Sequence, residues 1–208
     1  MGRGVYRSTG FLSSAVLKQA VEVIPEIRSL PVMESLLELL NRSEHRGELS
    51  YFLIGGRSLE AHGIVRFTKD VDFLIAYTHI DAMASTLKKA GYHQEVENQI
   101  FSRWKHASML VDDVDVMYVR PEVFAKLSQD TVLFSIGDQT VRVPSIPSLI
   151  ALKLHAIRSN PDRETKDGRD IAELLERAKG RLQRSDVEAL FAKYGCEHLL
   201  QRYLPLVP

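Results

Sequence analysis

Two aspartates separated by one residue, Asp70 and Asp72, are the part of the sequence best suited to chemistry. They lie in an apolar, strand-like run, and an earlier apolar run ends at the glycine pair Gly55 and Gly56. Residues two apart in a strand project from the same face, so the two carboxylates can hold a divalent cation. Glycines let the backbone approach an anionic group closely. A metal site and a phosphate site this close together indicate chemistry on a nucleotide.

The same alternation assigns faces to the residues before the aspartates. If the chain is extended there, Arg66 and Thr68 project with the two aspartates, and the residues between them face a core. The expected core face comprises Val65, Phe67, Val71 and Phe73. The alternative is a solvated edge strand with two surface acids, the commoner meaning of an isolated Asp-x-Asp. The glycine pair, the flanking apolar runs and the aligned Arg-x-Thr favour a site.

These residues resemble the signature of the DNA polymerase β-like nucleotidyltransferase superfamily. Its pattern, apolar-Gly-Gly/Ser, a spacer and Asp-apolar-Asp/Glu-apolar, is matched by Ile54–Gly56 and Asp70–Phe73 with a long spacer. The fuller string G-G…H-G-x-x-R-x-T-x-D-x-D is most similar to the bacterial branch of AbiEii-type and related nucleotidyltransferase toxins. The resemblance implies that Asp70 and Asp72 bind Mg²⁺ or Mn²⁺, as one or two ions, and that a third carboxylate completes the site.

The resemblance also implies contacts with a triphosphate. Gly55, Gly56 and the start of the following helix would present backbone N–H groups to it. Ser58 would add a hydroxyl. Arg66 would neutralise phosphate charge, and Thr68 would lie beside it.

The third carboxylate has its candidates in a second acidic strand, over 109–119. Alternation gives Asp113 and Asp115 the same face, whereas Asp112 and Asp113 are typical of a turn that opens a strand. Asp115, flanked by valines, matches the apolar-Asp-apolar element of the superfamily. We expect Asp115 to complete the site, with Asp113 as the alternative; an ordinary exposed acid is the other interpretation.

A lysine is expected at the site from a helix over 147–158. Lys153 stands in an apolar run, which is costly for an ammonium unless it meets an anion. The resemblance directs Lys153 at the active site and the nucleotide phosphates. It makes Asp170 a candidate anchor for Lys153 and a member of the nucleotide-binding site. Alternatively, the stem of the lysine packs while its head reaches water. Asp167 we interpret as an acid of a helix N-terminus without further role, and Arg163 matches the superfamily pattern only loosely.

Composition narrows the class of protein. The 208 residues carry 27 Lys and Arg against 27 Asp and Glu, which argues against a nucleic-acid coat protein but permits a local basic groove. The single Cys196 excludes an internal disulfide framework and fits a reducing compartment. Without an apolar run of membrane-spanning length or a signal-peptide core, we expect no membrane partner and a cytoplasmic location.

The pattern of elements predicts an α/β fold of the α+β kind, with helices around a mixed sheet. We divide the chain into an N-terminal arm and helices over 1–46, a nucleotidyltransferase core over 47–145 and a helical region over 146–208, packed as one unit. Strands are expected over 51–55, 70–76, 91–106 and 109–119, with a hairpin over 132–143. Helices are expected over 13–24, 31–46, 57–62, 79–90, 147–158, 166–178, 185–194 and 196–203.

The function expected from these features is transfer of a nucleoside monophosphate from an NTP to a hydroxyl. The acceptor would be RNA such as tRNA, a protein or a small molecule, and the resemblance adds a toxin with an antitoxin partner as one form of the activity. A metal-dependent phosphodiesterase is one alternative, disfavoured because no His-rich cluster surrounds the carboxylates. A non-enzymatic binding protein is another, disfavoured because an inert descendant has no need of closely spaced like charges.

Overall fold

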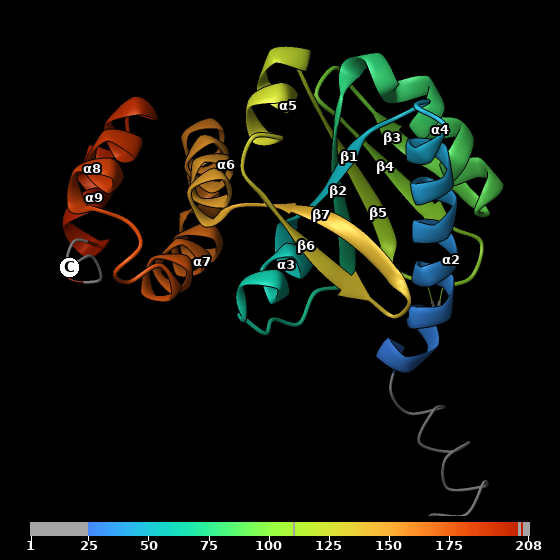
Figure 1. The fold of residues 1–208 in the computed structure, drawn as a ribbon, viewed down its shortest axis with the longest axis horizontal. Helices are drawn as coiled ribbons and strands as arrows, with labels where there is room; N and C mark the ends of the chain where they lie inside the picture. The colour runs from blue at the N-terminus through green and yellow to red at the C-terminus, as the bar shows by residue number, and fades with distance from the viewer. Residues whose placement is uncertain (1–24, 110, 204, 206–208) are drawn as a thin grey trace, which may run out of the picture.

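A mixed five-stranded sheet forms the centre of the computed structural model, which describes residues 25–109, 111–203 and 205 (Figure 1). Its strand order is β1-β2-β5-β4-β3. The strands are β1 (Tyr51–Ile54), β2 (Asp70–Ala76), β3 (Tyr92–Glu97), β4 (Phe101–His106) and β5 (Asp113–Val119). β2 and β5 run parallel, and the other neighbouring pairs are antiparallel. This mixed sheet among helices confirms the predicted fold class.

One face of the sheet packs against the two helices α2 (Pro25–His45) and α4 (Ile80–Lys89). Alternate residues of β2 point to this side, so Val71, Phe73 and Ile75 are fully buried in the main core. Burying each such side chain stabilises the fold by about 1.5–3 kcal/mol. The core orientation predicted for Val71 and Phe73 is confirmed.

The opposite face of the sheet changes character along its strands. Phe52 of β1 and Leu74 and Ala76 of β2 form a second apolar cluster with α5 (Pro121–Leu127). Earlier in β2 the same face carries the aspartates, since residues two apart share a side. The cluster fixes the far end of this face and leaves its acidic end open for a site.

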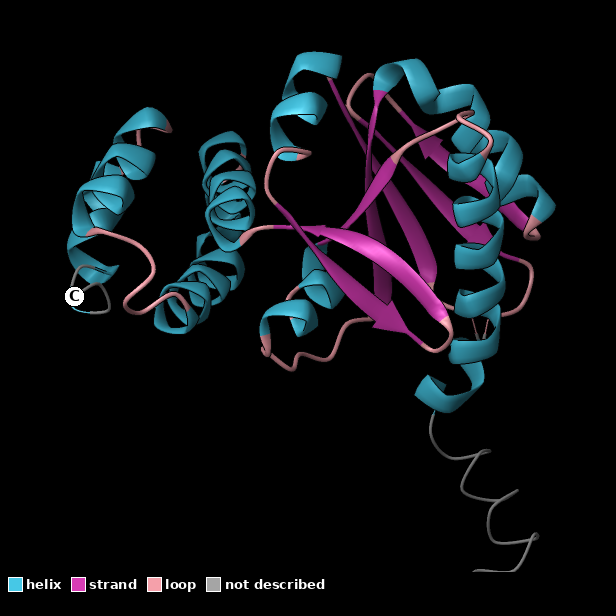
Figure 2. Cartoon of the chain, viewed as in Figure 1, coloured by secondary structure: helices cyan, strands magenta, loops and turns pink. Residues whose placement is uncertain are grey.

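The other elements are a hairpin and a set of helices. The hairpin consists of β6 (Thr131–Ile136) and β7 (Gln139–Pro144), turned at Gly137 with φ 55°, as predicted. The remaining elements are α3 (Gly55–Ser58), η1 (Glu60–His62), η2 (Tyr77–His79), α6 (Ile146–Ser159), η3 (Pro161–Arg163), α7 (Glu164–Arg177), α8 (Arg184–Lys193) and α9 (Glu197–Tyr203). In Figure 2, α6 and α7 lie between the strands and the outermost pair, α8 and α9.

The segment before β2 differs from its prediction. Val65 and Phe67, expected in the core, are 93% and 65% exposed. The 3₁₀ helix η1 ends at Gly63, whose φ of 75° turns the chain, and the ladder of β2 starts only at Asp70. Without a neighbouring strand, alternation assigns no buried face to this segment. The prediction that these two apolar side chains are buried was therefore wrong.

Some expectations lie beyond what the structure tests. The helix predicted over 13–24 is outside the described residues, and the division at 46 and 145 stays a prediction. Among the helices that the structure does describe, none combines the length and apolarity needed to cross a bilayer.

Candidate active site

Asp70, Asp72 and Asp115 line one cavity on the open face of the sheet. Parallel pairing of β2 with β5 sets Asp72 directly beside Asp115. The same register sets Asp70 beside Asp113, which is not among the residues that form the described cavity wall. Strand alternation permitted either aspartate of β5. The structure places Asp115 with the aspartate pair, and its role as a metal ligand stays a prediction.

The carboxyl group of Asp72 is perturbed by its surroundings. Burial of Asp72, together with the negative charges of Asp115 and Asp70, raises the pKa of its carboxyl to about 6. The positive charges of Lys166 and Lys153 act in the opposite direction and lower this pKa. The repulsion expected from the spacing of the aspartates is thus present. A divalent cation bound here would relieve it.

Arg103 of β4 holds Asp115 in a two-pronged ion pair. Its Nε donates to Asp115 Oδ1 at 2.8 Å and its Nη2 donates to Oδ2 at 2.7 Å. The register of β4 with β5 sets the two residues opposite each other. Sequence analysis missed Arg103, because alternation in 101–106 gives it a face without revealing which strand lies beside it.

The glycine turn lies against the carboxylates. Gly55 has φ 68°, in the left-handed region, and a Cβ there would overlap the carboxylate of Asp72. A Cβ on Gly56 would lie 2.9 Å from Thr68 Cβ. Glycine is therefore required at 55 both by its backbone conformation and by close packing. The turn was predicted to let the backbone approach an anionic group, and in the structure that group is the carboxylate of Asp72.

The two hydroxyls expected at the site have different surroundings. Ser58 is completely buried and donates a hydrogen bond from Oγ to the Gly55 carbonyl at 2.8 Å. Its hydroxyl therefore supports the turn from within. Thr68 lines the cavity, and its Oγ1 donates to the backbone carbonyl of Asp70 at 3.2 Å. Contact of either hydroxyl with a nucleotide stays a prediction.

A buried charge network forms the wall opposite the sheet. Lys153 Nζ of α6 donates to Asp170 Oδ2 at 2.5 Å and to Asp167 Oδ1 at 3.2 Å, both on α7. Arg163 Nε donates to Asp167 Oδ2 at 2.7 Å, and Arg66 pairs with Asp170. The anchor predicted for Lys153 is confirmed. Asp167 lies in the first turn of α7, as expected. The interpretation that it has no further role was wrong, because it is 1% exposed and paired with two cations.

The cavity has two lobes that meet at the carboxylates. The polar lobe has a volume of about 440 Å³ and is walled by the glycine turn, Arg66, Lys69 and Lys166 among others. The apolar lobe, of about 320 Å³, extends between β4, β5 and α6. Asp72, Asp115, Arg103, Lys153, Gly55, Arg163 and Asp167 belong to both walls.

The donor set suits a hard divalent cation. Three carboxylates facing one cavity supply the oxygen ligands that Mg²⁺ and Mn²⁺ prefer. The raised pKa of Asp72 shows that the nearby lysines do not offset its burial and the charges of the other two aspartates. In the described part of the chain, however, the side chains as placed form no ready cluster of three metal-ligating groups. Arg103 occupies both oxygens of Asp115. An ion that used Asp115 would therefore have to share it with Arg103.

Comparison with solved structures identifies the fold. The solution structure of the antibiotic-resistance factor ANT(2'')-Ia is 16% identical to this chain, with a TM-score of 0.59; the match covers 83% of this chain and 94% of that one. The crystal structure of ANT(2'')-Ia in complex with adenylyl-2''-tobramycin is 17% identical, with a TM-score of 0.57 and coverage of 81% and 98%.

A third similar structure is that of an antigenic nucleotidyltransferase-like protein from Paracoccidioides brasiliensis. It is 17% identical, with a TM-score of 0.51 and coverage of 85% of this chain and 93% of that one. No protein-family profile matches the chain, and no curated protein sequence matches it. The chain thus has the fold of nucleotidyltransferases, while the expected tie to the AbiEii-type branch stays a prediction.

Replacing Gly55 by alanine should destabilise the protein by more than the strain of a left-handed backbone alone. Gly180 has φ 76° with no atom within 4 Å of an added Cβ, so Gly180→Ala isolates the left-handed strain, about 1–2 kcal/mol. Gly55→Ala adds the overlap with Asp72 and should lower the free energy of unfolding by more. Urea denaturation measures both, and equal losses would contradict the close packing.

Asp72→Asn should stabilise the metal-free protein at neutral pH. Because the folded pKa is raised, the folded state binds the proton more tightly than the unfolded chain, and wild type loses stability as the pH rises from about 4 through 6. In EDTA at pH 7.5 the variant should be more stable by roughly 1–3 kcal/mol. The difference should shrink as the pH falls toward 4.

Asp138→Asn, at an exposed turn position, is the control for this measurement. It removes one carboxylate without touching the cavity and should follow the wild-type stability across the same pH range. A constant difference between Asp72→Asn and wild type at every pH would contradict the perturbed carboxyl.

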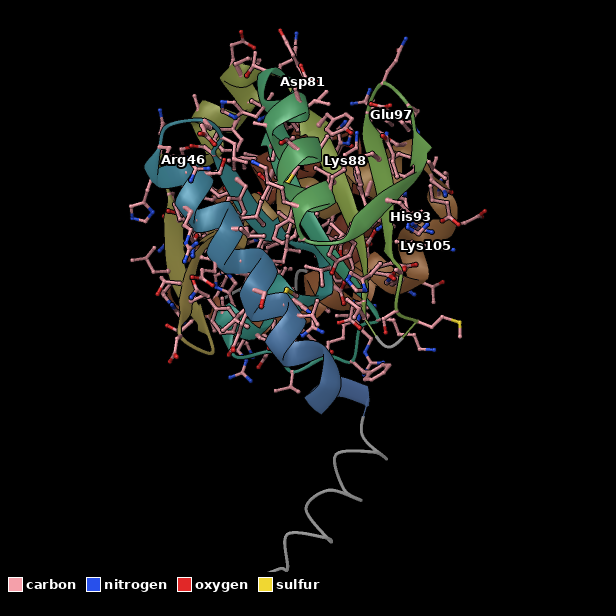
Figure 3. The ribbon with its side chains drawn as sticks, turned by 90° about the vertical axis from the view of Figure 1, so that its right-hand side faces the viewer. Arg46, Asp81, Lys88, His93, Glu97 and Lys105 are labelled. Atoms are coloured by element: carbon pink, nitrogen blue, oxygen red, sulfur yellow. The ribbon has the colours of Figure 1, made fainter. Side chains whose placement is uncertain are left out.

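Lys153→Met should destabilise the fold strongly. The change keeps the apolar stem but removes a cation shared by two buried carboxylates, and breaking a buried ion pair costs about 3–5 kcal/mol. Lys105→Met is the control. Lys105 lies on β4 (Figure 3) in a solvent-exposed pair with Glu95, and surface pairs of this kind contribute little to stability. Equal urea midpoints for the two variants would argue against the buried network.

Proposed function

We propose that this protein is a metal-dependent nucleotidyltransferase that moves a nucleoside monophosphate from an NTP to an acceptor hydroxyl. The observation that carries the proposal is the set of three carboxylates on one sheet face, packed against a glycine turn and facing a cationic wall. Nucleotidyl transfer requires charge neutralisation around a triphosphate and alignment of the reacting oxygens. The fold shared with nucleotidyltransferases supports the same activity.

Asp70, Asp72 and Asp115 would hold Mg²⁺ or Mn²⁺. Bound there, the metal would supply charge neutralisation and polarisation at the transferred phosphoryl group. Arg103 would then orient Asp115 and compensate part of its charge. Gly55 keeps the backbone close to Asp72, where no side chain can intervene.

The polar lobe would bind the triphosphate. Its wall combines Arg66, Lys69 and Lys166 with Thr68 and the glycine turn. Lys153 is engaged by Asp167 and Asp170, so its effect on phosphate would be mainly electrostatic. Asp170 would hold Arg66 and Lys153 in position without itself meeting the nucleotide.

The acceptor that we propose is a small molecule. One neighbour was crystallised with adenylyl-2''-tobramycin, the product of adenylyl transfer to a small molecule, and this supports a small-molecule acceptor for the present chain. Transfer to tRNA or protein, and an antitoxin partner, rest on the sequence resemblance alone.

Binding of a non-hydrolysable NTP, α,β-methylene ATP, tests the proposal. By isothermal titration calorimetry, wild type should bind it with Mg²⁺ and at least tenfold more weakly in EDTA. Asp115→Asn, and the double variant Asp70→Asn with Asp72→Asn, should lose this metal-dependent gain. Asp113→Asn, on the same face but outside the described cavity wall, should retain it.

Thermal melting of the same variants separates a lost site from a lost fold. A double variant that remains folded and binds the Mg²⁺ complex as tightly as wild type would sink the assignment. Loss of binding in Asp113→Asn with retention in Asp115→Asn would move the third ligand to Asp113.

A further inference from the structure

The apolar lobe is a second compartment of the same cavity, with a chemistry unlike that of the polar lobe. Met117 of β5 and Phe101 of β4 form its floor, where the register sets them side by side. Leu149, Leu152 and Ala156 form its roof. They are spaced by three and four residues on α6, and so share one helical face.

The lobe reaches away from the triphosphate site along the strands. Asp70, which lines only the polar lobe, comes before Asp72 in β2. Met117, which lines only the apolar lobe, comes after Asp115 in β5. Because Asp72 and Asp115 are paired neighbours in parallel strands, the two lobes extend in opposite directions from this pair. The carboxylates mark the boundary between them.

The geometry of in-line displacement at phosphorus predicts which ligand occupies each lobe. The attacking oxygen and the leaving pyrophosphate lie on opposite sides of the reacting phosphorus. If the triphosphate occupies the polar lobe, the acceptor hydroxyl must approach from the apolar lobe. Resting on the nucleotidyltransferase function proposed above, we propose that the apolar lobe binds the acceptor, a small uncharged molecule with an apolar face next to its hydroxyl.

The charges of the lobe fit an uncharged molecule rather than a polycation. The acids in its described wall are Asp72, Asp115 and Asp167. Arg103 takes both oxygens of Asp115, and Asp167 is paired with Lys153 and Arg163. Asp72 is assigned to the metal. An aminoglycoside such as tobramycin carries several ammonium groups, and the described wall offers them no further carboxylate.

The size and the mouth of the lobe agree with a small ligand. Its volume of about 320 Å³ lies at the lower end of small-molecule sites. Ile100 is 67% exposed, and Met117 on the floor is 37% exposed, so apolar surface of the lobe remains to be covered. The nucleoside of the NTP is the competing occupant, and the two occupants make opposite predictions for nucleotide affinity.

A charged substitution in the lobe separates these occupants. Met117→Lys places an ammonium on the floor, and because Met117 is partly exposed we expect the variant to fold. Leu133→Lys is the matched control, an exposed strand position of the hairpin at 74% exposure. Calorimetry with Mg²⁺ and α,β-methylene ATP should give both variants a Kd within twofold of wild type. A tenfold or greater loss in Met117→Lys alone would give the lobe to the nucleoside and overturn the proposal.

Two probes then test the acceptor chemistry, each added to the protein saturated with Mg²⁺ and α,β-methylene ATP. 2-Phenylethanol is an uncharged alcohol with an aromatic face, and tobramycin is a polycationic one. Saturation-transfer NMR should detect binding of 2-phenylethanol to wild type and to Leu133→Lys, with at least a fivefold smaller signal in Met117→Lys. Tobramycin should give no Met117-dependent signal. Absence of 2-phenylethanol binding to the nucleotide-saturated wild type would contradict the proposal.

These experiments distinguish failure of the acceptor assignment from failure of the nucleotidyltransferase function on which it rests. If wild type does not bind the Mg²⁺ complex of α,β-methylene ATP, nucleotidyl transfer itself is contradicted. If it binds and the lobe variants or probes behave otherwise than stated, only the acceptor assignment fails.

Discussion

Parallel pairing of β2 with β5 is the constraint on which the site depends, because it fixes Asp72 and Asp115 side by side on one face. Two carboxylates so placed repel each other, and burial adds to the cost, as the raised pKa of Asp72 shows. Positive side chains around the two carboxylates reduce this repulsion. Arg103 clamps Asp115 from the neighbouring strand, and the positive charge of Lys153 acts on Asp72 from α6.

The buried network of Lys153, Asp167 and Asp170 ties α6 to α7. Asp170 also receives Arg66 from the irregular segment before β2, so one carboxylate joins three separate parts of the chain. Such a network stabilises only when each buried charge has a partner, and here each is paired within hydrogen-bond distance. The same pairs define the cavity opposite the carboxylates. Structural integrity and the shape of the proposed active site therefore depend on the same contacts.

Local patterns in the sequence predicted much of this arrangement. Alternation gave Asp70 and Asp72 a common face and Val71 and Phe73 a place in the core, and both are confirmed. The hairpin at Gly137 is also confirmed. So is the partnership of Lys153 with Asp170, which the family resemblance implied and local spacing did not. Other features were mispredicted or missed. Alternation failed for Val65 and Phe67, because the ladder that gives a strand its faces begins only at Asp70.

The sequence by itself determined the chemical inventory: the paired aspartates, the glycines of the turn and the lysine in an apolar run. These follow from residue type and short spacing, which the chain carries locally. Tertiary structure decided which distant groups meet. It selected Asp115 over Asp113 for the cavity, brought Arg103 to Asp115 and buried Asp167 between two cations. Strand register and helix packing set these contacts, and both depend on the whole fold because neighbours in space are far apart in the chain.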